Sequence, residues 1–237
     1  MVFYVYSPLW FSGFDSILEI FIICICFLIS YYSFKSYKIF NILKFKYFSI
    51  SFLLFGISYI FKIMSNLIFV IPKQETIKIS LINLSFISYE RLKYINDISF
   101  FIHKITLILS LIILFLIISK EEKIETIFVT CLFGIILSFL INSYLIFNFL
   151  IVLLTLFLFL MSYFKTKFIN HKNNEYNEQK IKNKKNVKLN LFFLGLFLSY
   201  FNLFLAVGNI NFYFIGEIIL CFSFIYLFLK LLQIFKK

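Results

Sequence analysis

The chain has 237 residues, of which 62% are hydrophobic and 14% charged, and its mean hydropathy is +0.98. A soluble globular domain is about half apolar and about a quarter charged, so this composition excludes such a domain, and equally a disordered chain or a coiled coil. The net charge of +12 does not call for a nucleic-acid partner, because lysines in the cytoplasmic loops of a membrane protein give the same excess.

The apolar residues fall in blocks of roughly 18 or more, the length at which a helix crosses a bilayer. We therefore expect an all-α, polytopic integral membrane bundle with seven transmembrane helices in a single transmembrane domain. The fourth and fifth spans form one apolar stretch, which we divide near Asn142, because one helix through both would be about 58 Å long. The predicted spans are 15–34, 47–71, 98–119, 124–141, 145–164, 189–207 and 212–234.

The lysines between these spans predict the orientation of the chain. Sixteen lysines lie in segments 35–46, 120–123, 165–188 and 236–237, whereas the segments on the opposite side carry only four basic residues, all within 72–97. Short loops rich in lysine remain in the cytoplasm. The expected protein is a multi-pass protein of the cell membrane with its N-terminus outside and its C-terminus in the cytoplasm.

Two connecting segments are longer than tight turns. Residues 72–97 are the one sizeable outer loop, and their mixture of apolar and polar residues fits either an amphipathic interfacial helix or a two-stranded flap. Residues 165–188 are basic and rich in Lys and Asn, and we expect a flexible cytoplasmic linker there. No repeat of 20–50 residues and no inverted repeat between halves is evident, which disfavours a secondary transporter.

The polar and small residues of each span fall on one helical face, which we expect to contact neighbouring helices because polar groups in lipid need partners. Five ionisable residues lie in the predicted outer half of the membrane. They are Glu19, Lys62, His103, Lys104 and Glu217.

Lys62 decides whether these residues form a cluster. If its helix continues to Ile71, its Cα lies about 13 Å below the outer boundary, beyond the reach of a stem of about 6 Å, and the ammonium needs Glu19 or Glu217 as a partner. If the helix ends near Asn66, the ammonium reaches water instead. His103 and Lys104 lie about one turn inside their span and are expected to anchor it at the interface. A cluster would form a proton-sensitive switch, a ligand pocket or a structural ion pair.

No catalytic motif, metal cluster or cofactor signature is evident. The four cysteines fall inside apolar spans, and Cys24 and Cys26 point about 200° apart on a helix, so they cannot chelate one ion together. The His-Glu-x-x-His motif of metalloproteases is absent from the sequence. We expect no catalytic residue, no metal and no cofactor, and a protein that is not an enzyme.

The layout is similar in plan to seven-span receptor and sensor modules, including the membrane input regions of some histidine kinases, with no shared residue motif. The leading hypothesis is a non-enzymatic protein that senses or binds a small molecule or lipid from the outer side and acts through a cytoplasmic partner. The alternative is a membrane subunit of a transport or secretion/assembly complex, packed against another membrane protein.

Overall fold

The computed structural model describes residues 14–70, 89–119, 132, 134, 136, 144–172, 180–206, 208–209 and 211–235. This part of the chain is helical almost throughout. Its helices are α1 (Phe14–Phe40), α2 (Leu43–Val70), α3 (Tyr89–Ser119), α5 (Tyr144–Lys172), α6 (Lys180–Leu205) and α7 (Asn211–Phe235). Five of them are long and apolar enough to cross a membrane, and α6 contains a shorter apolar segment, Leu189–Leu205. The chain is a multi-pass helical membrane protein.

Six of the seven predicted spans correspond to a described helix. The predicted fourth span, 124–141, lies outside the described residues except for 132, 134 and 136, which are helical. The described chain therefore contains six helices, five of which have the length and composition of a span, in place of the seven that the sequence predicts.

The helices extend further than the predicted spans at two loops. Helix α3 begins at Tyr89, so the last part of the predicted outer loop 72–97 is helical, while 72–88 lies outside the described residues. Helix α5 continues to Lys172 and α6 begins at Lys180. The prediction of a flexible linker over 165–188 is therefore wrong for 165–172 and 180–188. Lysine is a good helix former, so a basic segment can continue a helix beyond the apolar span.

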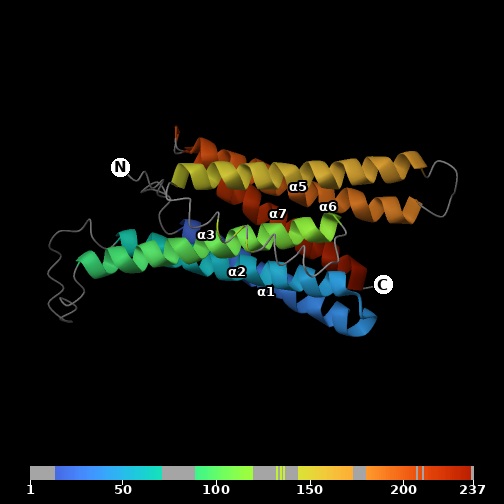
Figure 1. The fold of residues 1–237 in the computed structure, drawn as a ribbon, viewed down its shortest axis with the longest axis horizontal. Helices are drawn as coiled ribbons and strands as arrows, with labels where there is room; N and C mark the ends of the chain where they lie inside the picture. The colour runs from blue at the N-terminus through green and yellow to red at the C-terminus, as the bar shows by residue number, and fades with distance from the viewer. Residues whose placement is uncertain are drawn as a thin grey trace.

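The described helices form a closed ring. Following the chain, α1 packs against α2, α2 against α3, α3 against α5, α5 against α6 and α6 against α7, and the ring closes where α7 packs against α1. Helices α1, α2 and α3 gather along one long side of the bundle and α5 and α6 along the other, while α7 crosses obliquely from α5 and α6 towards α1 (Figure 1). The ring thus consists of two groups of three helices, joined where α3 meets α5 and where α7 meets α1.

The polar faces of the described helices contact neighbouring helices, as predicted. Hydroxyl groups on these faces link neighbouring helices: Ser49 Oγ donates to the Ser30 carbonyl oxygen at 2.8 Å, and Ser51 Oγ donates to the Ser110 carbonyl oxygen at 2.8 Å. Such bonds satisfy polar groups where lipid offers no partner. In α1 the buried polar and small residues are Asp15, Glu19, Cys26, Ser30, Ser33 and Ser36.

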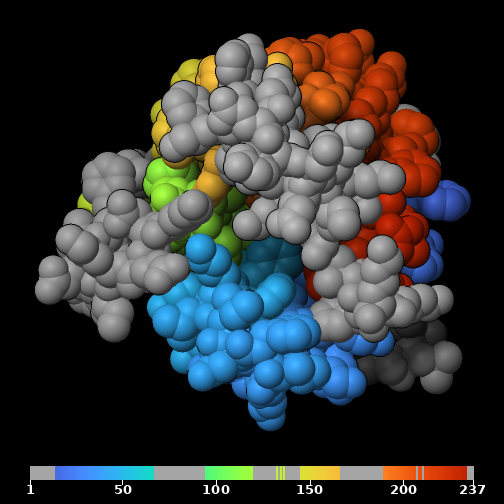
Figure 2. All heavy atoms as spheres, turned by 90° about the vertical axis from the view of Figure 1, so that its right-hand side faces the viewer, coloured from blue at the N-terminus to red at the C-terminus, as the bar shows by residue number. Residues whose placement is uncertain are grey.

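The turn between α1 and α2 marks one end of the bundle, which Figure 2 views from outside. Asn41 in this turn has a φ of 52°, a left-handed conformation that asparagine tolerates better than most residues, and its amide donates to the Tyr37 carbonyl oxygen at 2.8 Å. Lys35, Lys38 and Lys46 around the turn are exposed. We call this end of the bundle the basic end.

Four phenylalanines fill the centre of the ring, and we call them the phenylalanine cluster: Phe52, Phe55, Phe192 and Phe224. All four are fully buried. Phe52 lies 5.9 Å from Phe192 and 6.0 Å from Phe224 between ring centroids, and Phe55 lies 5.6 Å from Phe224. The cluster joins α2 of one group of helices to α6 and α7 of the other.

Close packing of α6 against α7 generates a first prediction. A Cβ at Gly195 would lie 2.1 Å from Ser223 Oγ and 3.0 Å from Ser223 Cβ, so Gly195→Leu is expected to push the two helices apart and lower stability by about 1–3 kcal/mol, the usual cost of overpacking. Thermal unfolding in detergent measures the change. Gly208→Ala is the matched control, because a Cβ at Gly208 has its nearest neighbour at 3.7 Å. Equal melting temperatures for the two variants would contradict the prediction.

Candidate functional site

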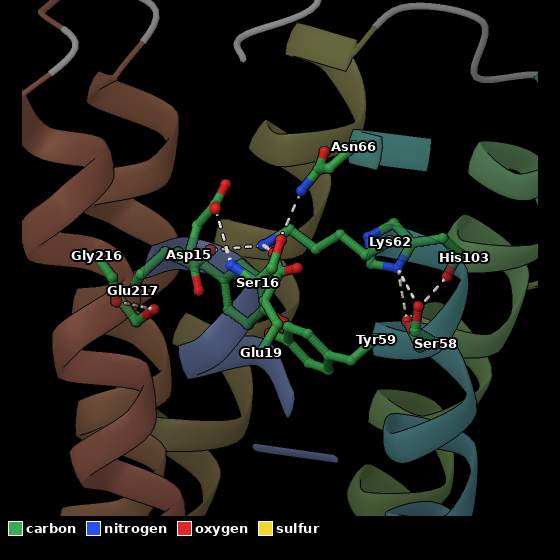
Figure 3. Close-up of polar contacts among 12 residues, drawn as sticks. Asp15, Ser16, Glu19, Ser58, Tyr59, Lys62, Asn66, His103, Gly216 and Glu217 are labelled. Carbon is green, nitrogen blue, oxygen red and sulfur yellow. Dashed lines mark hydrogen bonds and ion pairs between the residues drawn. The ribbon is translucent and has the colours of Figure 1, made fainter. Parts of the chain in front are cut away.

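Lys62 lies between two carboxylates from two other helices. Its Nζ is 2.9 Å from Glu19 Oε1 of α1 and 2.5 Å from Glu217 Oε1 of α7. Figure 3 shows the Lys62 side chain extending from α2 towards both acids. This partnership is one of the two outcomes that the sequence leaves open for Lys62, and we call the three residues the triad.

The helices bring the triad together at one level of the bundle. Helix α2 continues to Val70 and does not end at Asn66. As expected in that case, the ammonium of Lys62 contacts the carboxylates inside the ring. Glu19 lies about 7.5 Å from the beginning of α1 and Glu217 about 9 Å from the beginning of α7 at helical rise. All three therefore lie towards the end at which α1 and α7 begin, opposite the basic end, and we call this the triad end.

The carboxylates are more deeply buried than the amine. The side chains of Glu19 and Glu217 are 0% exposed, whereas that of Lys62 is 15% exposed. Each carboxylate uses its Oε1 on Lys62, while Glu19 Oε2 and Glu217 Oε2 are buried with no hydrogen-bond partner within the described part of the chain. If all three groups are ionised, the triad carries a net charge of −1. A buried site of this kind favours one further positive charge or hydrogen-bond donor.

Aromatic rings and an amide complete the surroundings of the ammonium. Lys62 Nζ lies 5.3 Å from the ring centroid of Tyr59 and 5.8 Å from that of Tyr213, distances at which a ring face attracts a cation. Asn66 Nδ2 donates to Glu19 Oε1 at 3.4 Å. The Tyr59 hydroxyl lies 3.1 Å from the Tyr200 hydroxyl of α6. The triad is thus bounded on the side of the basic end by a pair of hydrogen-bonded tyrosines.

His103 lies beside the triad and bonds to α2. Its Nδ1 is 2.7 Å from Ser58 Oγ and 3.0 Å from the Ser58 carbonyl oxygen. Because a carbonyl oxygen only accepts, a hydrogen on Nδ1 satisfies the second contact. His103 is buried, and its ring lies 6.3 Å from that of Tyr59. The hydrogen bonds of His103 therefore lie inside the ring.

Lys104 is placed differently from the other predicted residues. Its Nζ lies 5.1 Å from the Phe100 ring and 5.7 Å from the Phe101 ring, both on α3, and the residue is buried. The structure thus brings together Glu19, Lys62 and Glu217, sets His103 next to them through Ser58, and places the Lys104 ammonium against aromatic rings of its own helix.

Three residues of this region do not stand out in the sequence: Tyr59, Tyr200 and Tyr213. The chain contains 15 tyrosines, so the residue type alone does not single out a position. The one signal available is spacing, because Tyr59 lies three residues before Lys62 and faces the same side of α2.

Within the described ranges, no group of three or more His, Cys, Asp or Glu residues could hold a metal ion. No protein-family model, curated protein or solved structure matches the chain. The geometry of the triad is accordingly the main guide to function.

Removal of the ammonium alone is expected to destabilise the bundle. Lys62→Met leaves two buried carboxylates without their shared partner, and loss of one member of a buried ion pair costs about 3–5 kcal/mol. The triple variant Glu19→Gln, Lys62→Met, Glu217→Gln removes every charge and should recover most of that loss. Unfolding of the purified variants in detergent measures both changes.

Lys230→Met provides the control for this experiment. Lys230 donates to Gln233 Oε1 at 3.2 Å within one turn of α7, and an exposed contact of this kind contributes little. Equal losses of stability for Lys62→Met and Lys230→Met would contradict the idea that the triad holds the three helices together.

Proposed function

We propose that this protein binds a small, positively charged molecule at the triad from the outer side of the cell membrane, as a non-enzymatic binding or sensing protein that acts through a cytoplasmic partner. The observation that carries the proposal is the pair of buried oxygens, Glu19 Oε2 and Glu217 Oε2, for which the described residues provide no hydrogen-bond partner. A cation with N–H groups supplies both the charge and the donors that this site lacks.

The predicted topology supports access from the outer side. In this proposal the chain has seven spans with its N-terminus outside, so the triad end faces outwards and the basic end faces the cytoplasm. Phe147 of α5 contacts His103 at the middle of α3, and Lys165, further along α5, donates to the Ile118 carbonyl oxygen near the end of α3. Helices α3 and α5 therefore run in the same direction, an arrangement that suits a further span, the predicted 124–141, between them.

A purely structural ion pair is the main alternative to a binding site. A structural pair is most stable when each carboxylate is fully satisfied, whereas each acid of the triad leaves one oxygen without a partner in the described chain. The partial exposure of Lys62, at 15%, also gives the site a point of contact with its surroundings. These two features favour binding.

The topology is tested by labelling introduced cysteines on intact cells, in a background in which the four native cysteines are replaced. Gly208→Cys, in the exposed turn between α6 and α7, is expected to react with a membrane-impermeant maleimide from the medium. Lys180→Cys at the start of α6 is expected to react only after permeabilisation. Labelling of Lys180→Cys on intact cells would overturn the outward-facing site.

Ligand binding is tested with guanidinium, a small cation with N–H donors on every side. Millimolar guanidinium is expected to raise the melting temperature of the detergent-solubilised protein, because a ligand of the native state stabilises it. Urea at the same concentration should have no such effect, since it has a similar shape but no charge. Glu19→Gln and Glu217→Gln should each abolish the shift.

Asp97→Asn is the matched control variant for this experiment. Asp97 is exposed on α3 near the same end of the bundle, and its replacement makes the same chemical change outside the triad. It should retain the guanidinium shift. A shift that persists in both Glu→Gln variants, or that urea reproduces, would exclude the triad as the binding site.

A further inference from the structure

The two groups of three helices have the same internal arrangement. In the first, α2 lies between α1 and α3, and in the second, α6 lies between α5 and α7. The contacts between the groups also correspond, since α1 packs against α7 and α5 packs against α3. Exchange of α1, α2 and α3 with α5, α6 and α7 leaves this set of contacts unchanged, as expected for two units related by a two-fold axis along the bundle.

The sequences of the two units correspond as well. Residues 101–116 of α3 and 214–229 of α7 are identical at nine of sixteen positions, and residues 27–31 of α1 match 159–163 of α5 at four of five. Helices α2 and α6 share the dipeptide Ser-Tyr, at Ser58 and at Ser199. The abundance of Phe, Ile and Leu makes chance matches frequent, so contacts provide the stronger comparison.

Equivalent hydrogen bonds recur in the two units. Ser58 Oγ of α2 lies 3.2 Å from the His103 carbonyl oxygen of α3, and Ser199 Oγ of α6 lies 2.9 Å from the Gly216 carbonyl oxygen of α7. His103 and Gly216 are equivalent in the alignment of α3 with α7. The match therefore extends to both partners of the bond, which apolar composition does not explain.

A second pair of bonds repeats in the same way. Ser30 of α1 bonds to Ser49 of α2, and Ser162 of α5 bonds to Asn190 of α6. Ser49 and Asn190 are separated by the same 141 positions as Ser58 and Ser199. One alignment of α2 with α6 thus accounts for both sets of contacts.

Tyr59 and Tyr200 locate the axis. They are equivalent residues of α2 and α6, and their hydroxyls meet at 3.1 Å. A residue contacts its own equivalent only where it lies close to a two-fold axis. The joint between the units therefore passes through this tyrosine pair, next to the triad, which takes Glu19 and Lys62 from one unit and Glu217 from the other.

The joint is polar at one level and apolar at the next. On α2, Tyr59 lies about 4.5 Å from Lys62 along the helix axis and Phe52 lies about 15 Å from it, both towards the basic end. The phenylalanine cluster thus closes the joint between the triad and the basic end. A buried constriction of apolar side chains of this kind blocks ions and water until its two sides separate.

We propose that the protein is a transporter built from two copies of one three-helix unit, and that a small cation bound at the triad crosses the membrane between the two units. The inference rests on the proposed function, because it begins with the triad as a binding site. A cation that interacts with Glu217 competes with Lys62 for that carboxylate. It weakens a contact between the units, so that the units rotate against each other and open the joint at the phenylalanine cluster.

The test uses the full chain in liposomes, with radiolabelled guanidinium as the probe and with the native cysteines replaced. Tyr32 of α1 and Phe228 of α7 face each other across the joint, 6.2 Å apart between ring centroids. In the double variant Tyr32→Cys, Phe228→Cys, a short thiol cross-linker applied after reconstitution is expected to reduce uptake to the level of protein-free liposomes. The same sample before cross-linking should transport guanidinium, which shows that it is folded.

A pair inside one unit provides the control. Phe149 of α5 and Phe204 of α6 lie 5.9 Å apart between ring centroids, so cross-linking of Phe149→Cys, Phe204→Cys should leave uptake unchanged. Guanidinium that raises the melting temperature but never enters liposomes would overturn the transport proposal and leave the binding site standing. Uptake that survives the Tyr32–Phe228 cross-link would equally overturn it. Loss of both the thermal shift and uptake would reject the proposed ligand class itself.

Discussion

One ammonium shared by two carboxylates sets the constraint that organises this bundle. In a medium without water, Lys62 cannot remain charged unless an acid accompanies it, and Glu19 and Glu217 meet that need from α1 and α7. Helix α2 must then lie within reach of both. The requirement fixes three helices at one level, and it does so across the boundary between the two halves of the ring.

The other buried polar groups also need partners inside the bundle, but they are mostly uncharged, so burying them costs less free energy. Several serine hydroxyls bond across neighbouring helices, as at Ser30 and Ser49 or Ser199 and Gly216, so that adjacent helices are held by short local bonds. The phenylalanine cluster then fills the space that the polar groups leave. Polar layers and an apolar layer succeed each other along the bundle, and in the triad two buried carboxylate oxygens have no hydrogen-bond partner among the described residues.

Features of the fold that depend on burial of charge and on segment length are predictable from the sequence. The depth of Lys62 predicts a carboxylate partner if its helix continues past Asn66, and Glu19 and Glu217 are the candidates on other spans. The helical extensions at 165–172 and 180–188 were missed, since polar composition says little about whether a helix continues in water. The proposed correspondence of the two halves does not stand out in the sequence either, because a Phe-, Ile- and Leu-rich chain resembles itself everywhere and only contacts show which resemblances are meaningful.

The correspondence of α3 with α7 pairs Lys104 with Glu217. Two separate but identical subunits would have to place the same side chain at both of these positions, and a symmetric pair of acids or of amines would repel. Joining the two units in a single chain removes that restriction, because each position can change without its counterpart. This single chain can therefore place opposite charges together near the two-fold axis. A homodimer of one three-helix unit could not do so.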